Sequence, residues 1–129
     1  MHALSYDYCV IRLVPRVDRE EFINVGVMVS CPTSGFLAAR IELDAPRLLA
    51  LDACLDVEAI ARQLSAIPQI CAGGVQSGPI GQLPARERFQ WLASTRSTMI
   101  QMSPVHTGRC SDPDDLVEHL LDRMVRRAR

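Results

Sequence analysis

The chain has 129 residues, of which 48% are hydrophobic and 22% are charged, and its formal net charge is −1. This length and apolar content fit one domain with a buried core, which we expect to span residues 1–129, and the charge balance argues against a nucleic-acid-binding protein. All 14 basic residues are arginine, so the sequence excludes a Walker-type phosphate loop and any lysine nucleophile or base.

The first third of the chain predicts three strands. The first runs from Tyr6 to Val14, the second from Phe22 to Cys31, and the third from Phe36 to Leu43, with turn residues at 32–35. In the second strand, alternate residues share one face, which we assign to the core: Ile23, Val25, Val27, Val29 and Cys31. Short connections between the strands predict an antiparallel arrangement.

The middle of the chain predicts helices. Asp44 is a suitable N-cap for a short helix that begins near Pro46. Asp56 is a suitable N-cap for a longer helix, with apolar residues at helical spacing up to Ile67. Because Pro68 disfavours helix at Ile67, we expect the helix to end there or soon after. The glycine-rich stretch 72–83 predicts a flexible loop.

The last third predicts a helix from Pro84 to about Ser94, a fourth strand from Ser97 to Val105, and a final helix capped by Asp112. The apolar stripe of the final helix comprises Leu116, Val117, Leu120, Leu121, Met124 and Val125. Together these elements predict an α+β fold: an antiparallel sheet of about four strands, with three or four helices packed mainly on one face.

The five cysteines, at positions 9, 31, 54, 71 and 110, lack the spacing of zinc or redox motifs. We expect free, buried thiols in the reducing cytoplasm. No stretch is apolar enough to cross a membrane, and the first residues lack the pattern of a secretory signal. The three histidines are too dispersed for a metal site, and no cofactor is expected.

Polar residues that suit ligand binding are concentrated between positions 86 and 108. A planar guanidinium suits phosphate or carboxylate, and a neighbouring tryptophan supplies a stacking surface. If helix and strand converge, an anionic ligand or nucleotide would be held by Arg88, Trp91, Arg96, Ser97, Gln101 and His106. The alternative is that these side chains hold the helix to the sheet and pair with nearby carboxylates.

A second polar group interrupts the first two strands. Gly26 indicates a bulge or the close approach of a backbone or ligand. Asn24 is a candidate binding residue that lies near Arg12 if the two strands pair. Arg12 stands in an otherwise apolar strand and needs a partner, which favours a structural salt bridge with Glu20, Glu21 or Glu42.

Two long motifs occur in order along the chain. The first joins Tyr6–Pro15 to Arg19–Val27, and the second comprises Arg88–Leu92, Arg96, Ser97, Gln101 and Ser103–Gly108. They resemble a bacterial family known only as domain of unknown function 3037, in which glycine is common where Glu21 stands. The resemblance implies no activity, cofactor or catalytic residue. It does imply a gene that often neighbours one for a HipA-like kinase protein.

The leading hypothesis is therefore a non-catalytic accessory domain that binds a protein partner, with the HipA-like kinase neighbour as the candidate. The alternative is a domain that binds a small anionic ligand or nucleotide through the Arg/Trp/His cluster. An enzyme is the least favoured reading, because no catalytic motif is recognisable and the carboxylates Asp7, Glu20, Glu21 and Glu42 are scattered.

Overall fold

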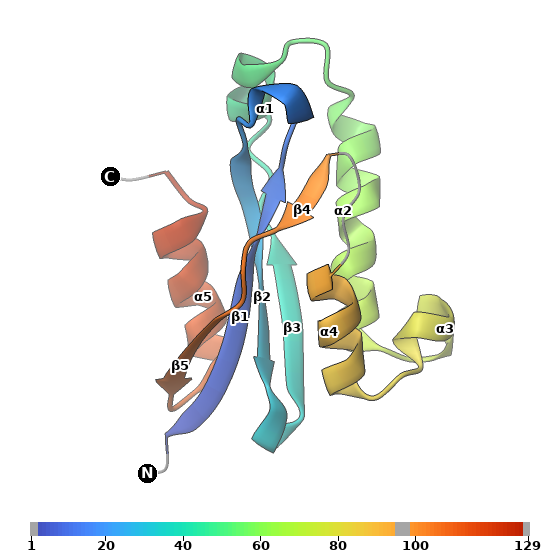
Figure 1. Cartoon of the computed structure of the whole chain (residues 1–129), viewed down its shortest axis with the longest axis vertical. Coiled ribbons are helices and arrows are strands. Elements are labelled where there is room, and N and C mark those ends of the chain that lie inside the picture. Colours follow the sequence, from blue (N-terminus) through green and yellow to red (C-terminus); the bar gives the residue numbers. More distant parts are fainter. Residues whose placement is uncertain (1–2, 95–98, 128–129) are drawn as a thin grey trace.

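The computed structural model describes residues 3–94 and 99–127. Its centre is an antiparallel sheet in which β3 (Phe36–Ile41), β2 (Ile23–Cys31) and β1 (Leu4–Leu13) lie in that order (Figure 1). Two short strands, β4 (Ile100–Met102) and β5 (His106–Cys110), divide the outer edge of β1 between them. The predicted α+β class and antiparallel sheet are confirmed.

Within the described ranges, five helices accompany the sheet: α1 (Ala45–Leu51), α2 (Val57–Ala72), α3 (Gly78–Gly81), α4 (Ala85–Ser94) and α5 (Pro113–Met124). Single 3-10 turns lie at Val17–Arg19 (η1), Pro32–Ser34 (η2) and Val75–Ser77 (η3). The predicted caps are confirmed, because the carboxylates of Asp44, Asp56 and Asp112 each accept a backbone N–H of the first helical turn. No helix in the described ranges is long and apolar enough to span a bilayer.

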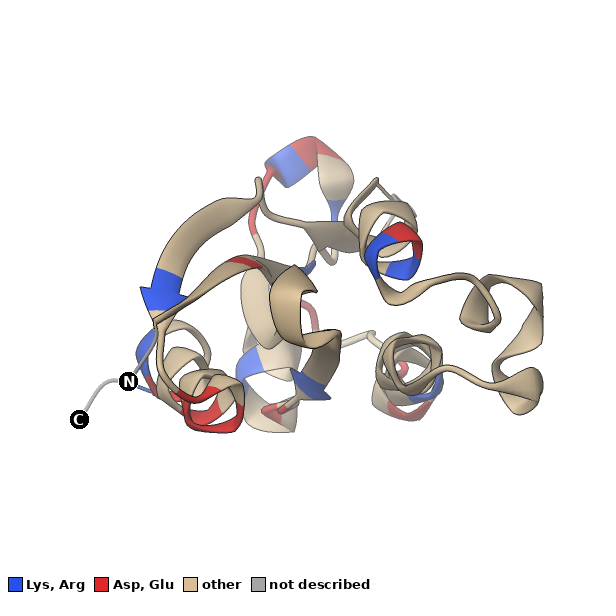
Figure 2. Ribbon diagram, turned by 90° about the horizontal axis from the view of Figure 1, so that it is seen from below, with Lys and Arg blue, Asp and Glu red and all other residues tan. Residues whose placement is uncertain are grey.

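Helices cover both faces of the sheet (Figure 2). On one face α1, α2 and α4 bury a core that includes Leu48, Leu64 and Phe89. On the other face α5 alone packs Leu120 and Leu121 against the sheet. The predicted apolar stripe of the final helix is thus confirmed, and most helices do lie on one face.

A β-bulge in β2 decides which residues face which helices. Ile11 pairs with Gly26 but Arg12 pairs with Asn24, so Val25 is an extra residue without a partner on β1. As a result Val25 points into the core beneath α2, whereas Val27 and Val29 point into the core beneath α5. The prediction of one core face for this strand is therefore wrong, because the bulge switches the alternation and helices bury both sides.

Gly26 is required at this bulge. A Cβ at this position would lie 2.5 Å from the carbonyl oxygen of Arg40 and 2.8 Å from Cδ1 of Ile41. The backbone of β3 therefore approaches Gly26 too closely for any other residue.

Three other expectations need correction. The helix α2 continues four residues past Pro68, because its buried stripe of Ile60, Leu64, Ile67 and Cys71 keeps packing on the sheet. The expected loop at 72–83 contains the short helical segments η3 and α3. Of the predicted fourth strand from Ser97 to Val105, only Ile100–Met102 is a strand (β4) in the described residues, positions 97–98 lie outside them, and a further strand, β5, begins at His106.

Ser103 joins the two halves of the outer edge. Its hydroxyl accepts the N–H of Val10 at 2.8 Å, and its own N–H donates to the carbonyl of Val10 at 2.9 Å. The side chain thus replaces a missing ladder bond where β4 gives way to β5, so the buried N–H of Val10 stays satisfied.

We expect Gly26→Ala to destabilise the domain by about 2 kcal/mol or more, because the new methyl group would press on the Arg40 carbonyl. Chemical denaturation measures the change in the free energy of unfolding. Gly35→Ala is the matched control: Gly35 has a φ of 73° but open space around it, so about 1 kcal/mol is expected. Equal losses in both variants would show that the bulge tolerates a side chain.

Candidate functional site

Three of the predicted site residues form one row across the sheet. Arg12 of β1 pairs in register with Asn24 of β2 on one side and with Gln101 of β4 on the other. Their neighbours Ile11 and Leu13 point into the core beneath α2, so the row lies on the opposite face, beside the end of α5. The expectation that Asn24 lies near Arg12 is confirmed.

Arg12 stacks on an aromatic ring instead of pairing with a carboxylate. Its guanidinium carbon lies 4.3 Å from the centroid of the Phe22 ring, which is cation–π geometry. Its Nε is shielded from water and has no hydrogen-bond partner among the described residues. The predicted salt bridge is wrong for two of its three candidates, because Glu21 pairs with Arg19 and Glu42 pairs with Arg126. The third candidate, Glu20, forms no ion pair with Arg12 within the described ranges.

Arg12 is unusual among the five half-buried arginines that the structure describes. Arg86 pairs with Asp7 at 2.7 Å, and Arg126 forms two hydrogen bonds with Glu42. Arg47 and Arg88 donate to backbone carbonyl groups. Arg12 alone, in this set, has neither a carboxylate nor a carbonyl acceptor.

Asn24 connects the row to α5. Its Nδ2 donates to the carbonyl of Met124 at 2.9 Å, which satisfies one of the last carbonyl groups of the helix. Its Oδ1 is shielded from water and has no partner in the described part of the chain. The row therefore contains a buried donor and a buried acceptor that the protein leaves unpaired.

Arg88 has a structural position. Its guanidinium donates to the carbonyls of Ile70 and Cys71 at the end of α2, and its Nε donates to the carbonyl of Leu83. These bonds hold the start of α4 against the end of α2. The alternative, that these side chains hold the helix to the sheet and pair with carboxylates, is therefore right for Arg88 only in that its role is structural: it joins α4 to α2, through carbonyl groups.

The other members of the predicted cluster do not meet Arg88. Trp91 lies on the outer side of α4, where it lines a hollow of about 560 Å³ with Leu83 and Glu87. His106 begins β5 and lies 5.3 Å from the Tyr8 ring, on the face that α5 covers in part. Arg96 and Ser97 lie outside the described residues.

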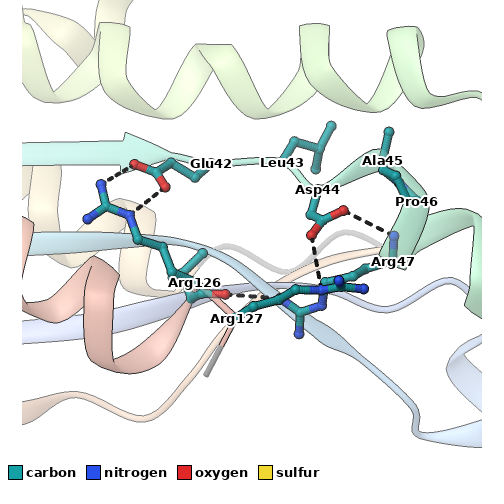
Figure 3. A pocket seen from close by; sticks show the side chains of 9 residues that line it. Glu42, Leu43, Asp44, Ala45, Pro46, Arg47, Arg126 and Arg127 are labelled. Carbon is teal, nitrogen blue, oxygen red and sulfur yellow. Dashed lines mark hydrogen bonds and ion pairs between the residues drawn. The ribbon is translucent and has the colours of Figure 1, made fainter. Parts of the chain in front are cut away.

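Sequence reasoning missed a charged hollow of about 580 Å³ between the β3–α1 connection and the end of α5 (Figure 3). Arg126 spans it, with bonds of 2.8 and 2.7 Å to Glu42 and a further contact to Glu118. Hydrogen bonds from Arg126 lower the pKa of both carboxyl groups. From the sequence, Glu42 was considered only as a partner for Arg12 and as one of four scattered carboxylates. The available signal was the run of arginines at the end of the chain, at positions 123, 126, 127 and 129.

The expectation of free, buried thiols is confirmed for three cysteines. Cys9, Cys31 and Cys71 are buried and free. Burial raises the pKa of Cys9 and of Cys71 to about 12 and that of Cys31 to about 11, so these thiols stay protonated near neutral pH. Cys54 is exposed and free, which differs from the expectation.

We expect Arg12→Met to leave the free energy of unfolding within about 1 kcal/mol of the wild-type value. The loss of the Phe22 stack is offset by removing an unpaired buried donor. Arg88→Met is the matched control and should cost about 2 kcal/mol or more, because three carbonyl bonds disappear. A large loss for Arg12→Met in urea denaturation would instead make Arg12 a structural residue.

The Arg126 cluster predicts an acid-sensitive contribution to stability. Because the folded-state pKa of Glu42 and of Glu118 is lowered, the contribution is fully present above the unfolded-chain pKa of about 4.3 and is lost as the pH falls through the lower folded values. The melting temperature of Arg126→Gln should therefore fall less steeply than that of wild type below about pH 5. Arg62→Gln, at an exposed position on α2, should keep the wild-type slope.

The family comparison covers this site and nearly the whole fold. A family model described as "Protein of unknown function (DUF3037)" matches residues 8–125, a range that includes the Arg12 row and α5. Searches of curated proteins and of solved structures found no match. The resemblance noted from the two sequence motifs is thus confirmed, and the chain belongs to the DUF3037 family.

Proposed function

We propose that this domain is a non-catalytic module that binds a protein partner through the end of the sheet that carries Arg12 and Phe22. The observation that carries the proposal is a half-buried arginine with no carboxylate of its own, stacked on an aromatic ring that is itself 45% exposed. Arginine and aromatic residues are enriched at protein interfaces and dominate their binding energy.

Exposed apolar side chains gather at the same end of the molecule. Of the eight large apolar residues that are exposed in the described ranges, four come from η1, the start of β2 and α1: Val17, Phe22, Leu49 and Leu51. These segments lie together at the top of Figure 1. Exposed apolar side chains gathered at one end of a molecule, with charged residues beside them, favour a docking site there.

The partner that we propose is the HipA-like kinase protein suggested by the family resemblance, in the bacterial cytoplasm. A small-ligand function of the predicted Arg/Trp/His cluster has less support, because the positions of Arg88, Trp91 and His106 do not converge.

The test is co-expression of the chain with a tagged HipA-like protein, the gene neighbour that the family resemblance implies. We expect the two to co-elute in size-exclusion chromatography, and Phe22→Asp to abolish co-elution because it places a charge in the apolar contact. Circular dichroism checks that the variant is folded.

Val75→Asp is the matched control, because Val75 is 81% exposed but lies in η3, at the far side of α2 (Figure 1). It should co-elute like wild type. Separate elution of wild type and a soluble, folded partner would refute the proposal. Equal loss in both variants would refute the location of the surface.

A further inference from the structure

The surface proposed above contains the charge of Arg12, which no carboxylate of the described residues pairs with. Three carboxylates near this end serve other arginines: Asp52 pairs with Arg16, Glu21 with Arg19 and Glu42 with Arg126. Asp18 and Glu20 are exposed and form no ion pair with Arg12 within the described ranges. A half-buried charge without a counter-charge is costly, and this cost is recovered when an anion arrives.

The guanidinium of Arg12 is held ready for such an anion. Stacking on Phe22 fixes its plane, and its Nε is enclosed by protein. Neither Nη1 nor Nη2 donates to another residue in the described ranges, so the two-pronged end of the group is unused. A planar carboxylate accepts two parallel hydrogen bonds from this geometry.

The residues around Arg12 favour a ligand with a single negative charge over a phosphate. Asn24 already donates one of its two amide hydrogens to the Met124 carbonyl, so it leaves a single donor for a multiply charged oxyanion. The row also lies beside the end of α5, where the helix dipole places partial negative charge. A singly charged carboxylate is opposed less strongly by this dipole than a dianion is.

We propose that Arg12 binds a carboxylate side chain of the protein partner, and that an apolar residue next to that carboxylate packs on the exposed edge of Phe22. This inference rests on the proposed function and specifies its partner chemistry: an acidic side chain beside an apolar one. The contact is charge-assisted and partly shielded from water, which makes it stronger than an ordinary surface ion pair.

The first experiment measures the affinity of the partner for four forms of the chain by calorimetry. Arg12→Gln should weaken binding about 30-fold, because it leaves the partner's carboxylate unpaired. Arg12→Lys should weaken binding less, since lysine keeps the positive charge but lacks the two parallel N–H donors of the guanidinium. Arg62→Gln should bind like wild type. Equal binding by wild type and Arg12→Gln would overturn this inference and leave the proposed function standing, whereas no binding by wild type would refute the proposed function itself.

The second experiment identifies the anion without the partner. Side-chain NMR follows the Arg12 Nε–H and Phe22 ring signals during titration with N-acetylglutamate, N-acetylglutamine or inorganic phosphate at matched ionic strength, up to about 100 mM because one ion pair binds weakly. We expect shifts with N-acetylglutamate alone and none at Arg62. Shifts with phosphate but not with N-acetylglutamate would overturn the proposal in favour of a phosphate site, and no shift with either would overturn it outright.

Discussion

The extra residue in β2 is the constraint on which the rest of the structure depends. After the bulge in chain order, Val27 and Val29 point toward α5 and give that helix an apolar surface to cover. Before the bulge, Asn24 lies on the same face and donates a hydrogen bond to the carbonyl of Met124 at the end of α5. On this face of the sheet, α5 therefore ends where the apolar residues of β2 end. The close approach of β3 at Gly26 keeps this change of alternation in place.

Most of the fold was accessible from the sequence, because each successful prediction used a local physical signal. Asp44, Asp56 and Asp112 marked three helix starts, and the apolar stripe of α5 marked its buried side. The failures came from tertiary effects. Packing against the sheet carried α2 past Pro68, and the switch of faces in β2 required knowledge of its pairing with β1.

The candidate site was predictable only in part. Asn24 and Arg12 were identified because each contradicts the apolar pattern of its strand, and strand pairing then placed them together. Phe22 was missed as the partner of Arg12, since an aromatic residue in a strand carries no sign of cation–π stacking. The cluster that links Arg126 to Glu42 joins positions 84 residues apart, and no local sequence pattern indicates a pair so distant.

The divided outer edge of the sheet has a consequence for the behaviour of the protein at high concentration. A long, flat strand at a sheet margin exposes a continuous row of backbone groups that recruits further chains into fibrils. Here that margin consists of two short pieces of three and five residues, offset around Pro104 and the Ser103 hydroxyl. Neither piece is long enough to template the continuous pairing of a fibril, so this edge of the sheet resists edge-to-edge association.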